Sequence, residues 1–200
     1  MSEQSYLVSE DLKEAEGMVE GLIPYLESNE VYGRIGGGGI FGGGNQPALT
    51  AGALEMRLRR LRLLRDQMNA DQQGRLDALE ARYDETLKDW RAHYERRLLR
   101  EANSRLDAMR PFFQETTENP RLADSVYKPE LLRRTIVQDI MNALERLGVD
   151  SSELSSKARQ VDSRFRGVIG EAAPFQWDAQ LEPVYPQKDY WWLYRKPREV

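Results

Sequence analysis

Apolar residues recur every three or four positions between Leu49 and Met109, and this stretch contains no proline. Part of the pattern repeats every eleven residues, in the set Leu76, Leu87, Leu98 and Met109. An eleven-residue repeat corresponds to about 3.67 residues per turn, close to the 3.6 of an α-helix, so it keeps one apolar stripe on a nearly straight helix. The spacing therefore predicts a long helix over residues 70–110. Its stripe consists of Leu76, Leu79, Tyr83, Leu87, Trp90, Tyr94, Leu98, Ala102, Leu106 and Met109.

The same apolar spacing predicts a preceding helix, with a stripe of Leu54, Leu58, Leu61, Leu64 and Met68. Between the two helices, Asn69 and Gln72 have the spacing of a capping box, and Gly74 weakens the helix locally. We expect a tight turn here, which makes residues 49–110 an antiparallel helical hairpin. The alternative is one continuous kinked helix.

Three further helices are predicted by the same periodicity. The first begins after Ser9 as the N-terminal cap and is kinked or ended by Pro24, with a stripe of Leu12, Ala15, Met18, Val19, Leu22 and Leu26. The second begins at Pro129 and ends before Gly148, where glycine favours helix termination. The last covers residues 152–166. Pro111 is expected to bend or stop the long helix.

Two segments differ from these helices. Residues 33–44 are rich in glycine, and residues 171–200 are rich in proline and aromatic residues. The expected fold is all-α: an elongated, coiled-coil-like bundle of about five helices built round the long hairpin. In this organisation residues 1–170 form the helical bundle domain, with a Gly-rich loop over 33–47 inserted between the first and second helices. Residues 171–200 form an extended aromatic C-terminal tail that packs on the bundle or on a partner.

The composition fits elongated helices with much wetted surface, since 31% of the residues are charged and 40% hydrophobic. The chain has no cysteine, which excludes disulfides, thiolate metal sites and cysteine nucleophiles. No apolar run reaches the roughly 20 residues of a transmembrane helix, and the polar N-terminus does not resemble a signal sequence. We therefore expect a cytoplasmic protein without a transmembrane segment.

The charge is unevenly distributed although the net charge is only −4. The first helical segment carries Glu10, Asp11, Glu14, Glu16 and Glu20, and the next one carries Arg57, Arg59, Arg60, Arg62 and Arg65. Opposite charges favour docking of the two segments within one fold. Because Arg57 and Arg65 lie on or beside the apolar stripe, they are expected either to extend along apolar surface with the guanidinium in water or to pair with acids of the first helix. The alternative is a nucleic-acid-associated protein that uses these arginines together with the tail.

The glycine-rich segment formally contains G-x-G-x-x-G, at Gly37, Gly39 and Gly42. The dinucleotide fingerprint also requires a preceding strand and a helix opening at the last glycine, and here a helix precedes and Pro47 intervenes. No lysine follows the glycines as in a Walker loop. We expect a loop that is flexible or that a partner orders, formed by Gly36, Gly37, Gly38, Gly39, Ile40 and Phe41. The alternative is a nucleotide- or phosphate-binding enzyme that uses residues 36–44.

His93 is the only histidine, and Asp89 and Glu85 lie one and two turns before it. A di-iron bundle needs histidines on two helices, so these residues are better explained as a solvated helix face. No G-x-S-x-G motif supports a serine nucleophile. No catalytic residue, cofactor or metal site is predicted.

The tail gathers the residue types that dominate protein interfaces. The expected partner-binding residues are Tyr190, Trp191, Trp192, Leu193, Tyr194 and Arg195. In an extended chain, alternation places Tyr190, Trp192 and Tyr194 on one side, as a latch on the bundle, and leaves the other side for a partner. The sequence thus favours a non-catalytic protein–protein interaction or scaffold protein. It would act through helix faces and the aromatic tail, on an unidentified protein partner or as a homo-oligomer.

Overall fold

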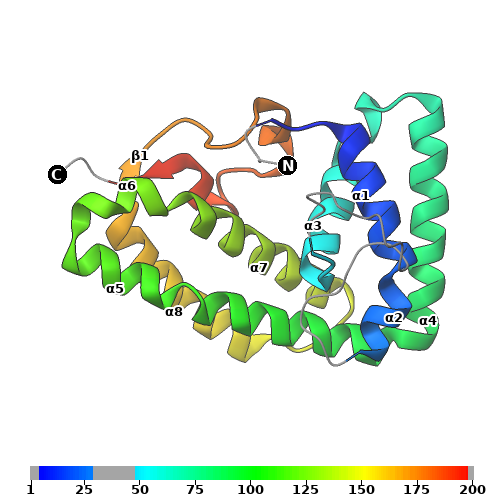
Figure 1. The fold of residues 1–200 in the computed structure, drawn as a ribbon, viewed down its shortest axis with the longest axis horizontal. Coiled ribbons are helices and arrows are strands. Elements are labelled where there is room, and N and C mark those ends of the chain that lie inside the picture. The colour runs from blue at the N-terminus through cyan, green and yellow to red at the C-terminus, as the bar shows by residue number, and fades with distance from the viewer. Residues whose placement is uncertain (1–4, 29–47, 198–200) are drawn as a thin grey trace, which may run out of the picture. The chain divides into compact units, whose positions relative to one another are not determined.

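The computed structural model describes residues 5–28 and 48–197, and this part of the chain is all-α except for one short two-stranded ribbon (Figure 1). Its eight α-helices are α1 (Val8–Glu20), α2 (Leu22–Glu27), α3 (Ala51–Leu63), α4 (Ala70–Asp107), α5 (Arg110–Glu118), α6 (Ala123–Val126), α7 (Lys128–Arg146) and α8 (Ser152–Val168). The 3₁₀ turns are η1 (Arg65–Gln67), η2 (Pro120–Leu122), η3 (Ala179–Val184) and η4 (Trp191–Tyr194). The ribbon pairs β1 (Glu171–Ala172) antiparallel with β2 (Arg195–Lys196).

The chain divides into two compact units, and α4 contributes to both. The N-terminal unit holds Leu7–Glu101. The C-terminal unit holds Ala102–Val200 together with the segment that ends at Tyr6. The division of the chain near residue 170, expected from its change in composition, stays a prediction.

In the N-terminal unit, α3 and α4 form the expected antiparallel hairpin. Residues late in α3 pair with residues early in α4: Arg62 Nε lies 2.6 Å from Glu80 Oε1. At the start of α3, Thr50 Oγ1 donates to Glu101 Oε1 at 2.7 Å, far along α4. The alternative of one continuous helix is therefore wrong, and α1 packs against α3 of this hairpin.

The turn between α3 and α4 is closed by the predicted capping box. The Asn69 backbone N–H donates to Gln72 Oε1 at 3.0 Å, and the Gln72 N–H donates to Asn69 Oδ1 at 2.9 Å. Two amides at the helix start are thereby satisfied by side chains. Gly74 follows inside α4, where a Cβ would meet no other atom within 4 Å.

The predicted stripe of α4 is buried except in its middle. Leu76, Leu79, Tyr83, Tyr94, Leu98, Ala102, Leu106 and Met109 are buried. Leu87 and Trp90 are only half-buried, which corrects the expectation of an unbroken apolar face. The helix ends at Asp107, and Pro111 lies in the first turn of α5 because a proline there loses no helical hydrogen bond.

The N-terminal helix differs from the prediction at both ends. Its cap position is Leu7, without a side-chain hydrogen bond, so Ser9 is not the cap. The helix ends at Glu20, and Pro24 lies inside the separate short helix α2. A side-chain cap is found instead at α3, where Thr50 Oγ1 accepts from the Ala53 N–H at 3.1 Å.

In the C-terminal unit, α7 ends before Gly148 as predicted, and Gly148 has φ +68°. The Gly148 N–H donates to the Glu145 carbonyl at 3.0 Å, and the Val149 N–H donates to the Leu144 carbonyl at 2.9 Å. This pair of bonds is the Schellman motif. The described residues form eight α-helices where about five were expected. The additional helices α2, α5 and α6 are too short for the spacing of apolar residues to predict them.

The tail is folded rather than extended. Two of its segments form the 3₁₀ turns η3 and η4, and β2 returns to pair with β1, next to the end of α8. Because residues 191–194 turn, the alternation expected for an extended strand does not hold. Adjacent Trp192 and Leu193 are both buried, at 1% and 0% exposure.

Candidate interaction groove between α5 and α8

A continuous chain of aromatic rings runs through the C-terminal unit. Neighbouring rings have centroids 4.9–6.4 Å apart, mostly in edge-to-face arrangement, which suits the quadrupoles of the rings. In order of contact, the chain consists of Phe112, Phe113, Phe165, Trp191, Trp192, Tyr190, Tyr185, Trp177, Phe175 and Tyr194. It joins α5 and α8 to the tail.

Specific polar contacts hold the tail against α7. Trp192 Nε1 donates to Thr135 Oγ1 at 2.9 Å, and the Arg134 guanidinium lies 4.1 Å from the centroid of the Trp192 ring. The Tyr190 hydroxyl donates to Asp139 Oδ1 at 2.6 Å. These contacts make the tail part of the folded unit.

The six tail residues expected at a partner surface are therefore all engaged within the unit. Tyr190, Trp192 and Leu193 are buried and offer no surface to a partner. The other three are half-buried. Arg166 covers the Trp191 ring at 3.9 Å, the Tyr194 hydroxyl donates to the Tyr185 carbonyl at 2.9 Å, and Arg195 Nη1 donates to the Gly170 carbonyl at 3.1 Å. The burial of Tyr190 and Trp192 places two of the three expected latch residues inside the unit.

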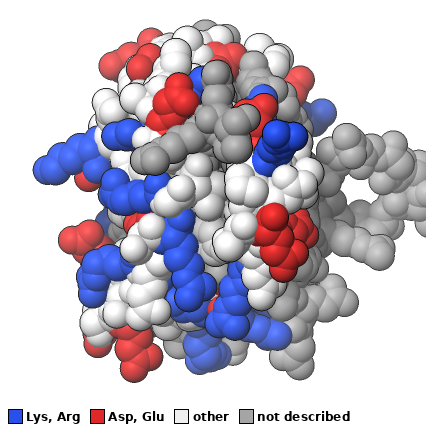
Figure 2. Space-filling model, turned by 90° about the vertical axis from the view of Figure 1, so that its left-hand side faces the viewer, with Lys and Arg blue, Asp and Glu red and all other residues white. Residues whose placement is uncertain are grey.

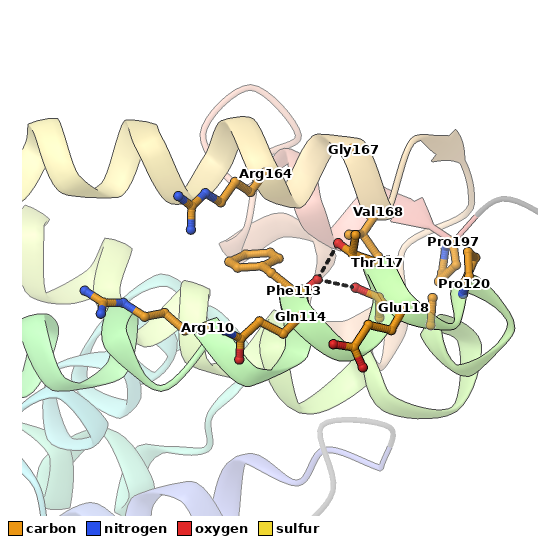
Figure 3. Close-up of a pocket in the computed structure, with 12 residues that line it drawn as sticks. Arg110, Phe113, Gln114, Thr117, Glu118, Pro120, Arg164, Gly167, Val168 and Pro197 are labelled. Atoms are coloured by element: carbon orange, nitrogen blue, oxygen red, sulfur yellow. Dashed lines mark hydrogen bonds between the residues drawn. The ribbon is translucent and has the colours of Figure 1, made fainter.

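A cavity of about 810 Å³ lies between α5 and α8 (Figure 3). Its wall at one end is formed by Pro120 and the buried Pro197, which follows β2. A second cavity of about 250 Å³ adjoins it and shares Arg110, Phe113 and Arg164. The two cavities form one groove along the helix pair, which we call the α5–α8 groove.

The middle of the groove is apolar. Phe113 is 7% exposed and is supported from behind by Phe112 and Phe165, with ring centroids at 5.4 and 6.3 Å. The hydroxyls of Thr116 and Thr117 donate to carbonyls of their own helix, each at 2.7 Å. These hydroxyls are satisfied without a ligand, so the surface there requires no polar partner.

One end of the groove is positively charged. In Figure 3 the side chains of Arg110 and Arg164 extend on the same side of Phe113, one from α5 and one from α8. Arg110 Nη2 donates to Asp107 Oδ1 at 3.0 Å, but both side chains are largely exposed, so the pair is weak. Arg164 makes no ion pair within the described residues. This end therefore offers two guanidinium groups to an anion.

Asp107, the acid that lines the groove beside Arg110, is already paired with a lysine. Lys157 Nζ donates to Asp107 Oδ2 at 2.9 Å, and this hydrogen bond is the main reason that the pKa of Asp107 lies below its usual value. The opposite end of the groove carries Glu118. Figure 2, seen from the side on which α5, α6 and β1 lie in Figure 1, shows both basic and acidic side chains around uncharged surface. The groove thus has a basic end, an apolar middle and an acidic end.

The arginine-rich helix is used differently. Arg57 Nε donates to Glu14 Oε2 at 2.9 Å and lies 3.4 Å from Asp11 Oδ1. The expected docking of the acidic segment on the basic one is therefore confirmed. Arg65 pairs with Asp77 of α4 at 2.6 Å, not with an acid of the first helix, and its side chain is partly exposed. These internal pairs occupy guanidinium groups that a nucleic acid would need.

The remaining sequence candidates yield no chemistry in the described part of the chain. The glycine-rich residues 36–41 lie outside the described residues. His93 is exposed, with its ring centroid 5.1 Å from that of Trp90. Residues 5–28 and 48–197 contain no group of His, Asp and Glu that could hold a metal ion. None of their helices is long and apolar enough to cross a membrane.

Comparisons with protein-family models, with curated proteins and with solved structures give no match. The α5–α8 groove is therefore the feature of the molecule that bears on its function. Sequence reasoning missed Arg110, Phe113 and Arg164, which belong to segments far apart in the chain. One signal was available: Pro111 suits the first turn of a helix, which predicts a new helix after the long one.

Proposed function

We propose that this protein is a non-catalytic interaction or adaptor protein whose C-terminal unit binds an amphipathic helical segment of a partner protein. The supporting observation is the α5–α8 groove, in which an apolar cavity of about 810 Å³ ends at two exposed guanidinium groups. Grooves between two helices commonly receive the apolar face of a third helix.

The geometry of the groove defines the chemistry of the segment. An apolar side chain of the partner lies over Phe113, where it is removed from water on the groove floor. A carboxylate one or two turns away lies between Arg110 and Arg164, because guanidinium groups bind carboxylates with paired hydrogen bonds. Glu118 at the other end disfavours an acidic residue there and thereby sets the direction of the segment.

The tail contributes to this function as a structural support. Pro197 lines the groove, and the aromatic chain from Trp191 to Tyr194 supports Phe165, which in turn lies behind Phe113. The aromatic tail therefore shapes the docking surface, and the exposed faces of α5 and α8 make the contact with the partner.

A displayed library of amphipathic helical peptides tests the proposal. Apolar positions vary among Leu, Ile, Met, Phe and Trp, and polar positions vary among Asp, Glu, Lys and Arg. Selection on the whole chain should enrich peptides with an acidic residue near one end of the apolar face. Fluorescence anisotropy of the selected peptides should give a Kd on the order of 10 μM, typical of small transient contacts.

The double variant Arg110→Glu with Arg164→Glu should weaken this binding at least about tenfold, as loss and reversal of charge pairs at an interface does. Arg159→Glu is the matched control, since Arg159 is an exposed arginine of α8 outside the groove lining. Unchanged thermal unfolding of both variants establishes that they fold. Failure to enrich any peptide, or equal binding by the double variant, would overturn the proposal.

A further inference from the structure

The basic end of the α5–α8 groove collects hydrogen-bond donors from two helices. Its smaller cavity, of about 250 Å³, is lined by three cationic side chains and one carboxylate: Arg110, Lys157, Arg164 and Asp107. Lys157, Gln160 and Arg164 follow one another at intervals of three and four residues, so they lie on one face of α8. Arg110 lines the same cavity from α5 (Figure 3). We call this end of the groove the basic pocket.

The Lys157 ammonium is fully used inside the protein. Lys157 Nζ donates to Asp107 Oδ2 at 2.9 Å, to Asn103 Oδ1 at 3.1 Å and to the Asn103 carbonyl at 3.3 Å. An ammonium group has three N–H donors, so none is left for a ligand. The charge of Lys157 compensates that of Asp107, and the basic pocket keeps two positive charges.

The other donors of the basic pocket are available to a ligand. Arg110 donates to the second oxygen of Asp107 at 3.0 Å, but this pair is exposed and weak. Because Lys157 holds the first oxygen, Arg110 can turn to a ligand without leaving the carboxylate uncompensated. The exposed side chains of Gln160 and Arg164 make no hydrogen bond or ion pair within residues 5–28 and 48–197.

We propose that the basic pocket binds the phosphate group of a phosphoserine on the partner's helical segment, an inference that rests on the proposed function of the groove. A phosphoserine carries a charge of about −1.5 to −2 at pH 7 and three acceptor oxygens. Its charge matches the two positive charges of the pocket, whereas a carboxylate compensates only one of them. Arg110 and Arg164 donate paired hydrogen bonds to the phosphate oxygens, and the Gln160 amide donates to a remaining one.

The phosphate belongs to a protein segment because the basic pocket continues directly into apolar surface. Phe113 lines both cavities of the groove and is 7% exposed. A free phosphate ion gains nothing from this ring. A helical segment places an apolar side chain on the ring and a phosphoserine one or two turns away, on the same face of the helix.

Three matched peptides test the inference by fluorescence anisotropy with the whole chain. They share the sequence of the best library peptide and carry serine, glutamate or phosphoserine at its acidic position. The phosphoserine peptide should bind at least about tenfold more tightly than the glutamate peptide, and the serine peptide should bind most weakly.

A conservative variant separates the forked guanidinium groups from their charge. Arg110→Lys with Arg164→Lys keeps both positive charges but loses the paired donors, so the advantage of phosphoserine over glutamate should fall below about threefold. Arg159→Lys is the matched control, because Arg159 is an exposed arginine of α8 outside the groove lining, and it should keep the full advantage.

Lys157→Gln tests the lysine as a positioning residue. Without the ammonium, Asp107 repels the phosphate and retains Arg110, so the phosphoserine peptide should bind at least about fivefold more weakly. Adding Asp107→Asn removes that repulsion and should restore the affinity to within about twofold. Absence of this rescue would contradict the proposed arrangement of charges.

Equal affinities of the wild type for the glutamate and phosphoserine peptides would overturn the inference. The proposed function would stand in that case, because both peptides would still bind. Inorganic phosphate that displaces the phosphoserine peptide at a concentration near that peptide's own Kd would also overturn it, because the free ion would then be the ligand. If none of the three peptides binds, the proposed function fails and this inference fails with it.

Discussion

Arginine has two different roles in this protein, and Arg134, which donates to Asp162 at 2.6 Å, shows that the C-terminal unit contains internal pairs as well. In the N-terminal unit, Arg57, Arg62 and Arg75 each donate to a carboxylate of another helix, at 2.9, 2.6 and 2.8 Å. In the C-terminal unit, Arg110 and Arg164 extend beside an apolar cavity. The number of arginines in a segment therefore does not predict whether that segment binds an anionic partner. What matters is whether the fold provides an internal acid for each of them.

Both cores bury carboxylates, and they differ in their aromatic rings. The N-terminal unit buries the carboxylates Asp11, Glu55 and Glu101 among its helices. The Glu55 carboxylate accepts from two tyrosine hydroxyls, those of Tyr83 at 2.6 Å and Tyr94 at 2.9 Å. The C-terminal unit buries the carboxylates Glu130 and Asp139 as well, and a chain of contacting aromatic rings runs through it. Buried ion pairs add little net stability but are costly to break from one side, whereas buried rings stabilise in proportion to their apolar area.

Loss of a ring from the C-terminal core should have the largest effect. Trp192→Ala removes a fully buried ring, its hydrogen bond to Thr135 and its contact with Arg134. Urea unfolding followed by circular dichroism should show a loss of about 4 kcal/mol. The control is Leu122→Ala, at a side chain that is 41% exposed, which should change stability by less than about 0.5 kcal/mol. A loss below about 1 kcal/mol for Trp192→Ala would show that the tail is not part of the core.

Removal of one buried acid from the N-terminal core should cause the second-largest loss of stability. Asp11 is 2% exposed and lies 3.4 Å from Arg57 and 3.9 Å from Arg60. Asp11→Ala leaves the buried guanidinium groups of Arg57 and Arg60 without this carboxylate. The free energy of unfolding should therefore fall by about 3 kcal/mol. The matched control is Glu20→Ala, because Glu20 pairs with Arg82 at the surface, where ion pairs contribute less than about 1 kcal/mol. Equal losses for the two variants would contradict the distinction between buried and exposed pairs.

Two glycines, one in each unit, should respond to alanine with opposite signs. Gly148 has φ +68°, a conformation that disfavours a Cβ, so Gly148→Ala should destabilise by about 1 kcal/mol. Gly74 lies inside α4 with open space around its Cβ position, so Gly74→Ala should stabilise by up to about 1 kcal/mol. Thermal unfolding of both variants gives the signs directly, and two shifts of the same sign would contradict the structure.

The smallest expected effect is a pH dependence in the C-terminal unit. Burial raises the pKa of Glu130 above its usual value of 4.5, while the neighbouring Arg133 partly opposes the rise. The folded state then keeps a proton that the unfolded chain loses, so this group lowers stability as pH rises from about 4.5 through the raised pKa. Glu130→Gln should therefore be more stable than the wild type at pH 7, by less than about 1 kcal/mol, and equal to it below pH 4. A stability difference that does not change with pH would exclude this explanation.

Local sequence signals predicted much of the fold. The Asn69 capping box and Gly148 act through their nearest neighbours, so their geometry follows from residue type and spacing. The pairing of Arg57 with acids of α1 could be predicted because the first helical segment is acidic and the next one is basic. Ser9 failed as a cap because α1 begins at Val8, one residue before it.

The candidate site could not be predicted in the same way. Phe113, Arg164 and Pro197 are far apart in the chain, and only the packing of α5, α8 and the tail brings them together. The tail alternation failed because residues 191–194 adopt a 3₁₀ turn, which the proline-rich composition of the tail does not indicate. Features that depend on contacts between distant segments leave no periodic signal in a single sequence.

The most direct test of the account is a charge exchange across the α5–α8 groove. The Arg110→Glu, Arg164→Glu variant is titrated with the best acidic peptide from the library and with the same peptide in which the acidic residue is replaced by arginine. We predict that the wild type prefers the acidic peptide and the variant prefers the basic one, each by about tenfold in Kd. Identical preferences for the two proteins would show that these guanidinium groups do not contact the partner, and the proposed function would be wrong.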